Sequence, residues 1–455
     1  MILIALLVVV YVGLYVLLSV PSIQNKIKLM VCEETSALLG GKVGIESLTV
    51  LPFSEVILSD VSLDSPDGKR CACIKKVAAG IDIWRLISDR RIVLNYAEII
   101  GLDVNVVQDS LGAPTNIQFL IDALSPKDKT KPPTLFDLKI RNVVIRESKA
   151  SYLRRWMKAD NGKPLPLAEI KMERLRVDLS IPVLKNDFYK FLIRNMQFEL
   201  TPDVTVRSLA ADVEYVKDAS GDNDHLIVKD FNISLPNSSL NVADIDLNLA
   251  DLSDIETNLI GMITPSDFAG LLPQLNSFDS PWNLKIDARY LDNGVEVSEF
   301  AISNDDNNSY LSFNGNVGNI SKVDSLNLRV SGLKADFSEK IISGICDLIP
   351  KMSDKIKGII VSAGQIILEF DGSLTDSDKA KGKGMLSTGH GKIDFEAEGR
   401  SLKSKRPLFK VFANTEDLDI GALFNTDKVG PVSLAIDADF VGLDKNVEGI
   451  VSLSS

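Results

Sequence analysis

The sequence predicts a mainly β protein that begins with a transmembrane helix and contains only a few other helices. Two observations carry this prediction. Residues 2–20 include no charged side chain, and from Lys42 onward apolar and polar residues alternate in short runs separated by Gly, Asn, Asp or Ser. Alternation with a period of two places apolar side chains on one face of a strand and polar side chains on the other.

The first twenty residues, MILIALLVVVYVGLYVLLSV, are predicted to be a transmembrane anchor. As a helix this run is roughly 27–30 Å long, which is about the hydrocarbon thickness of a bilayer. The alternative is a cleaved signal peptide, which would have a basic start, a shorter apolar run and a small-residue cleavage site. The sequence has none of these features, but the first basic residues, Lys26 and Lys28, follow the run. Charge bias therefore does not fix the orientation of the anchor.

A juxtamembrane helix is predicted over residues 21–41. Pro21 suits the first turn of a helix and Gly40 suits its end, while the apolar residues between them fall near helical spacing. The later segments with helical character are 116–125, 266–275 and 336–356.

The remaining chain is expected to form two regions, a β/α cap over 42–131 and an elongated β region over 132–455, with a linker at Pro132 and Pro133. The alternation is clearest in four segments, 242–250, 284–290, 392–398 and 432–440. The apolar residues predicted to share one face are Ala243, Ile245, Leu247, Leu249, Leu284, Ile286, Ala288, Ile393, Phe395, Leu434, Ile436 and Ala438. The neighbours predicted to face water are Asp244, Asp246, Lys285, Asp287, Asp394, Asp437 and Asp439.

Charge and composition argue against several classes of function. The net charge is −12, whereas a nucleic-acid-binding protein needs a basic footprint. His225 and His390 have no recognisable catalytic partners, and the four cysteines complete neither a zinc site nor a disulfide framework. We therefore expect no enzyme activity, no metal and no cofactor.

Three short segments resemble ligand loops only in part. Residues 384–392 resemble a phosphate loop, but His390 stands where that motif requires Lys. Residues 221–225 and 375–382 carry alternating Asp, as calcium loops do, but lack the later Gly and Glu. Acidic turns are the simpler interpretation of both acidic segments.

In the order of its motifs the chain resembles the AsmA-like family, and within it the TamB-type translocation and assembly module proteins, in the form found in Bacteroidota. The N-terminal motifs are LLGGKVGIESLTVLPFSEVILSDVSLDSPDG (38–68), KKVAAGIDIWRLISDRRIVLNYAEIIGLDVNVV (75–107) and GAPTNIQFLIDAL (112–124), which contains an N-x-x-F-L helix. The later ones are TPSDFAGLLPQL (264–275), KGKGMLSTGHGKIDFEAEG (381–399) and DLDIGALFNTDKVGPVSLAIDADFVG (417–442). The chain departs from the family in two ways: it has no basic flank before the anchor, and it lacks the terminal domain of TamB.

This resemblance implies an elongated, twisted, mostly antiparallel open β-groove, taco-like in section, fixed in the inner membrane with the bulk of the chain in the periplasm. It also implies that the apolar residues named above line a groove for phospholipid acyl chains, and that the groove continues beyond the last residue. The implied function is a lipid bridge towards the outer membrane. The alternatives are an assembly factor for outer-membrane proteins, acting with a barrel partner through a region not in this chain, or an anchored structural β-protein.

Overall fold

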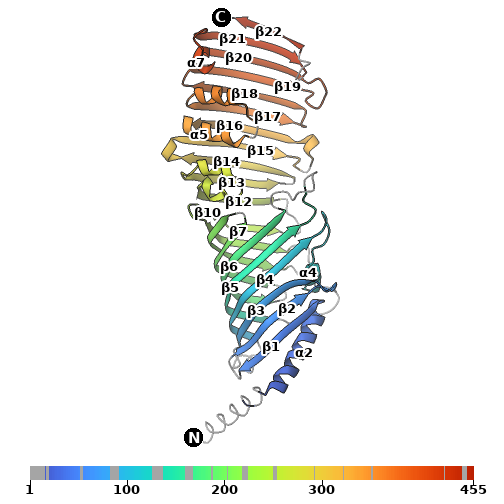
Figure 1. Ribbon diagram of the computed structural model, residues 1–455. Helices are drawn as coiled ribbons and strands as arrows, with labels where there is room; N and C mark the ends of the chain where they lie inside the picture. The colour runs from blue at the N-terminus through green and yellow to red at the C-terminus, as the bar shows by residue number, and fades with distance from the viewer. Residues whose placement is uncertain are drawn as a thin grey trace. The chain divides into compact units, whose positions relative to one another are not determined.

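The computed structural model describes residue 16 and residues 20–51, 55–81, 92–124, 137–158, 168–185, 188–201, 203–217, 224–248, 254–291, 293–320, 322–349, 352–424, 426–442 and 448–454. This part of the chain is mainly β, with few helices, as predicted from the alternation (Figure 1), and the strand pairs whose register is given below are antiparallel with one exception. The chain divides into two compact units, residues 1–236 and residues 237–455. The linker expected at Pro132 and Pro133 lies outside the described residues.

The predicted juxtamembrane helix is α2 (Pro21–Leu39), with Pro21 in its first turn. Gly40 ends the helix with φ 71°, a left-handed conformation that glycine adopts without steric cost. Nearly all of the predicted anchor lies outside the described residues. Among the helices that are described, none is long and apolar enough to cross a membrane.

The first unit contains the strands β1 to β9, each paired with the next along the chain. Their bounds are β1 (Lys42–Leu51), β2 (Glu55–Asp64), β3 (Arg70–Ile81), β4 (Ile92–Gln108), β5 (Asp137–Arg154), β6 (Glu169–Lys185), β7 (Phe188–Thr201), β8 (Val204–Val216) and β9 (His225–Ser234). The pair β4 and β5 is parallel. Parallel neighbours need a long crossover, and this one includes the helix α4 (Gln118–Leu124).

The N-x-x-F-L segment fastens this crossover to the sheet. The Asn116 side chain accepts a hydrogen bond from the Val107 amide at 2.7 Å and donates one to the Asn105 carbonyl at 2.8 Å. It thus bonds to backbone groups of β4 that lie beyond Val104, the last residue of β4 that pairs with β3. Phe119 packs at the start of β1, where a Cβ on Gly41 would lie 2.4 Å from the phenyl ring. A glycine is therefore required for this close approach.

The core of the first unit is a cluster on one face of the middle strands. Leu175 and Val177 of β6 pack with Phe198 of β7 and Val206 of β8, and all four are buried. Half-buried apolar residues of β5 to β9 surround them. The alternating strand sequence thus produces one apolar face in this unit, as predicted.

The second unit contains the strands β10 to β22. Their bounds are β10 (Ser239–Val242), β11 (Ile245–Asn248), β12 (Asp254–Ile263), β13 (Trp282–Leu291), β14 (Gly294–Asn304), β15 (Ser309–Gly318), β16 (Asn327–Phe337), β17 (Ile366–Thr375), β18 (Lys379–Thr388), β19 (Gly391–Arg400), β20 (Leu408–Asp419), β21 (Pro431–Val441) and β22 (Glu448–Ser454). From β12 to β22 each strand pairs antiparallel with the next one in the chain.

Three details of the second unit differ from the sequence prediction. The strand expected over 242–250 is interrupted at Ala243 and Asp244, which join β10 to β11. The helix expected over 266–275 is a pair of 3₁₀ turns, η1 (Pro265–Phe268) and η2 (Pro273–Ser277), because a proline begins each turn and Pro273 cannot continue a preceding helix. The helix expected over 336–356 is divided into α5 (Glu339–Leu348) and α6 (Asp354–Ser362), since Ser353 caps a new helix by accepting a hydrogen bond from the Ile356 amide.

Register shifts occur in consecutive strand pairs from β13 to β17. They lie between Asp287 and Ala288, Val297 and Phe300, Ser312 and Asn314, and Val330 and Leu333. A bulge bends its strand and increases the local twist. Bulges in neighbouring strands therefore curve this part of the sheet.

Candidate functional site

The apolar residues of the second unit form continuous rows that cross the strands. Directly opposed residues in antiparallel strands have side chains on the same face, so the register identifies which distant residues are neighbours. The first row runs from β13 to β21 and is apolar except at Thr415, whose hydroxyl hydrogen-bonds to the backbone of Leu434. Its members are Leu284, Ile302, Leu311, Ala335, Leu368, Leu386, Ile393, Thr415 and Leu434.

A second unbroken row on the same face consists of small or β-branched residues, and we call it the central row. Its members are Ala288, Val297, Gly315, Val330, Gly372, Gly382, Ala397, Val411, Ala438 and Val451. Larger side chains flank it on both sides. They include Ile286, Phe300, Phe370, Phe395 and Ile436 on one side, and Tyr290, Val295, Leu328, Leu374, Phe409 and Phe440 on the other.

Phenyl rings lie over the glycines of this face. A Cβ placed on Gly372 would be 2.4 Å from the ring of Phe370, and one on Gly382 would be 2.8 Å from the same ring. A Cβ on Gly384 would be 2.9 Å from the ring of Phe395. The two rings are themselves stacked, with centroids 6.3 Å apart. Because glycine has no side chain, the rings can lie close to the backbone of the sheet. Few side chains therefore protrude from this stretch of the apolar face.

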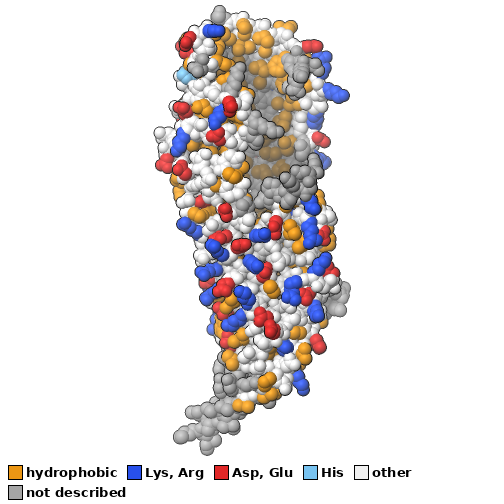
Figure 2. Space-filling model, viewed as in Figure 1, with side chains coloured by type: hydrophobic (Ala, Val, Ile, Leu, Met, Phe, Trp, Pro, Cys, Tyr) orange, Lys and Arg blue, Asp and Glu red, His pale blue; other side chains and the backbone are white. Residues whose placement is uncertain are grey.

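In the described part of this unit, helices cover one margin of the apolar face, and that margin includes Ile302 of the first row. Trp282, Ile302 and Phe337, at one end of their strands, pack with Phe278 and with Ile341 of α5. Across the rest of the face most side chains are half-buried, and among the described residues of this unit no second sheet lies over them, because all of its strands belong to one sheet. In Figure 2 this part of the surface is hollowed, and hydrophobic side chains gather inside the hollow.

The structure brings together every predicted groove residue from Leu284 onward. Leu284, Ile393 and Leu434 lie in the first row, Ile286, Phe395 and Ile436 lie beside the central row, and Ala288 and Ala438 lie within it. The earlier residues are placed differently. Ala243 is exposed between β10 and β11, Ile245 and Leu247 are half-buried in β11, and Leu249 lies outside the described residues.

The opposite face of the same sheet is charged, and ion pairs connect its strands. Lys285 pairs with Glu299 at 2.6 Å, and Lys381 pairs with Glu398 at 3.0 Å. The hydrogen bond from Lys381 lowers the pKa of Glu398, with Arg400 adding to the effect. Of the residues expected to face water, Lys285, Asp437 and Asp439 are exposed, as are Asp244 and Asp246, while Asp287 and Asp394 are half-buried.

Sequence reasoning missed most of the central row and the rings beside it. Gly372 and Gly382 carry no hydropathy signal, and Phe370 lies in a segment that was not singled out. Alternation in EFDGSL (369–374) and KGKGML (381–386) was the available signal. It could have identified the face of each residue but not its cross-strand partner.

No catalytic constellation accompanies the apolar face in the described part of the chain. His225 is in β9 and His390 follows β18, and the four cysteines are free. The described residues contain no group of three or more His, Cys, Asp or Glu side chains that could hold a metal ion. The absence of enzyme activity stays a prediction. Comparisons with protein-family models, with curated proteins and with solved structures find no match to this chain.

Proposed function

We propose that this protein is an inner-membrane-anchored bridge of the cell envelope that carries phospholipid acyl chains along the apolar face of its sheet towards the outer membrane. The observation that supports this proposal best is the pair of rows from β13 to β21, apolar except at Thr415, over which the described residues place no second layer of sheet and a helix only at one margin. The rows cross the strands, so they run along the direction in which the sheet grows by adding strands.

The energetics of lipid transfer match such a surface. Exposing each CH₂ group of an acyl chain to water costs about 0.8 kcal/mol, so a 16-carbon tail crossing water costs roughly 10 kcal/mol or more. A row of apolar side chains lowers this cost at every position along its length. Because adjacent strands are about 4.8 Å apart, the next pair of side chains is always within reach of the same tail. No catalytic group is required.

Photo-crosslinking tests the proposal directly. Ile436 lies on the apolar face and Asp437, the next residue, lies on the charged face of the same strand. A photoreactive amino acid at position 436 of the full chain in cells is expected to capture phospholipid, and one at position 437 is the matched control. Equal labelling at both positions, or labelling at neither, would refute lipid carriage on this face.

Analysis of the purified full chain distinguishes lipid carriage from the two alternatives, an assembly factor and a structural protein. Mass spectrometry of the purified full chain is expected to detect bound phospholipid. Isolation with an outer-membrane barrel protein and without lipid would instead support an assembly factor. A chain that carries neither would support a structural role.

A further inference from the structure

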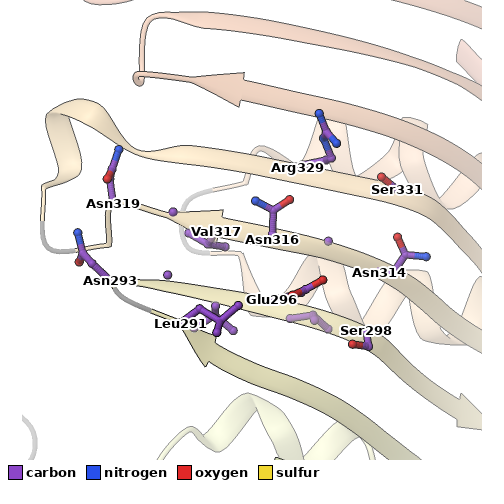
Figure 3. Close-up of a pocket in the computed structure, with 15 residues that line it drawn as sticks. Leu291, Asn293, Glu296, Ser298, Asn314, Asn316, Val317, Asn319, Arg329 and Ser331 are labelled. Carbon is purple, nitrogen blue, oxygen red and sulfur yellow. The ribbon is translucent and has the colours of Figure 1, made fainter. Parts of the chain in front are cut away.

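The charged face of the second unit contains a hollow that the apolar groove does not explain. It has a volume of about 760 Å³ and is bounded by β14, β15 and β16 and by the turns between them. Volumes of about 300–1,000 Å³ are usual for sites that bind small ligands. We call it the polar hollow, after the side chains of Glu296, Asn314, Asn316, Arg329 and Ser331 that line it (Figure 3).

Two glycines create its depth. Gly294 and Gly318 are directly opposed in register, one position along each strand from the residues of the apolar face, so neither places a side chain on the charged face. Leu291 and Asn319 stand beside them at the ends of β13 and β15. The hollow is therefore open where a typical strand pair would be filled by two side chains.

The five side chains after which the polar hollow is named differ from their neighbours on this face in making no polar contact within the described part of the chain, whereas Asn319 at its edge donates a hydrogen bond to the Ser325 carbonyl. Elsewhere on this face Lys285, Lys381 and Lys410 each pair with a carboxylate on the adjacent strand. In the described part of the chain no hydrogen bond or ion pair engages the side chains of Glu296, Asn314, Asn316, Arg329 or Ser331.

The register explains why Glu296 and Arg329 do not pair with each other. Both are opposed to Asn316, which separates them by two strand spacings, or roughly 10 Å. On its other side Glu296 is directly opposed to Arg289 of β13, so a cation lies next to it in register. The Arg329 guanidinium, with the Asn316 amide beside it, is available to a ligand. Asn314 and Ser331 are opposed in the next polar row and add an amide and a hydroxyl.

We propose that the polar hollow binds an oligosaccharide that carries a carboxylate. Arg329 supplies the fork of N–H donors that matches a carboxylate bidentately. Asn314, Asn316 and Ser331 each offer both a donor and an acceptor, as sugar hydroxyls require, while Glu296 accepts from hydroxyls. A peptide strand is a poorer fit, because the backbone groups of β15 are already paired on both sides with β14 and β16.

Calorimetric titration of the purified full chain with tetragalacturonate tests this proposal, with maltotetraose and tetraglutamate as comparison probes. Tetragalacturonate is expected to bind more tightly than either, because only it has both hydroxyls and carboxylates. Arg329→Gln is expected to weaken its binding by about tenfold or more, the usual effect of losing a charge-assisted contact.

Gly318→Val fills the hollow without disturbing the sheet. A Cβ at this position has only Asn327 Cβ nearby, at 3.8 Å, an ordinary contact, and valine suits a strand. This variant is expected to abolish tetragalacturonate binding and to retain the circular dichroism spectrum of the parent. Lys410→Gln removes a like charge from the same face outside the hollow and is expected to leave binding unchanged.

Several results would overturn the proposal. One is equal weakening by Lys410→Gln and Arg329→Gln, which would mean a diffuse charge effect. Another is tetraglutamate binding as tightly as tetragalacturonate, which would mean that hydroxyls are not recognised. Absence of tetragalacturonate binding to the parent, or undiminished binding to a folded Gly318→Val variant, would also exclude this site. None of these results bears on lipid carriage by the opposite face.

Discussion

Substitution of Gly382 by valine tests whether the phenyl rings lie over the glycines of the apolar face. A Cβ at Gly382 would lie 2.8 Å from Phe370 Cε2 and 2.9 Å from Cζ, so the ring must move. The contacting atoms are the far end of a half-buried side chain, so moving them is expected to cost about 1 kcal/mol, the low end of the range for overpacking a core. Displacing Phe370 also weakens its stacking on Phe395, which is worth about 0.5–1.5 kcal/mol. We expect the variant to lose about 2 kcal/mol of unfolding free energy, measured by urea denaturation followed by circular dichroism.

A double-mutant cycle tests whether the cost of the valine comes from its contact with the Phe370 ring. In a Phe370→Ala background the ring is absent, so Gly382→Val is expected to cost much less there than in the parent chain. Gly318→Val, the same substitution in the same sheet where the nearest atom is 3.8 Å away, serves as the matched control. If Gly382→Val costs as much without the Phe370 ring as with it, the ring does not lie over the glycine.

Further predictions concern lipid binding and pH. Ile436→Asp is expected to reduce bound phospholipid severalfold in mass spectrometry, because a charge that must be desolvated beneath an acyl chain costs several kcal/mol, whereas Asp437→Asn is expected to have no effect. The hydrogen bond to Asp224 raises the pKa of Tyr215 to about 12. Because the unfolded chain releases this proton at a lower pH, the contribution of Tyr215 to stability is complete below about pH 10 and is lost between about pH 10 and 12. A Tyr215→Phe variant should therefore lose less stability over this range in denaturant titrations. His390→Ala is expected to bind as much lipid as the parent chain, and loss of lipid from a folded variant would show that this side chain has a role.

The alternation with a period of two predicted which side chains of a strand share a face, but not which residues of other strands lie beside them. Alternation in LKIDARY and VSLAIDADF was sufficient to place Leu284 and Ile436 on the apolar side, because the side-chain period of a strand is fixed by its geometry. It could not place Gly382 beneath Phe370, since that contact depends on register, which the turn between β17 and β18 determines. The break at Ala243 was likewise invisible, because the alternation continues through it.

The polar hollow shows a different limit of sequence reasoning. Asn314, Asn316 and Arg329 read locally as ordinary solvent-facing residues of two strands. Only the register shows that Glu296 and Arg329 are both opposed to Asn316, so that these two charges lie too far apart to pair with each other. Single-sequence periodicity contains no information about such opposition between strands.

The pairing of each strand from β12 to β22 with its chain neighbour has a consequence for how this unit folds. The backbone pairing of each new strand is made with the strand that precedes it, so these contacts are local in sequence and their loop-closure entropy is small. Folding can therefore proceed vectorially, with each strand adding to the edge left by the previous one as the chain emerges from a ribosome or a translocon. For the same reason the length of the sheet can change during evolution by duplication or loss of single hairpins, while the rest of the unit keeps its register.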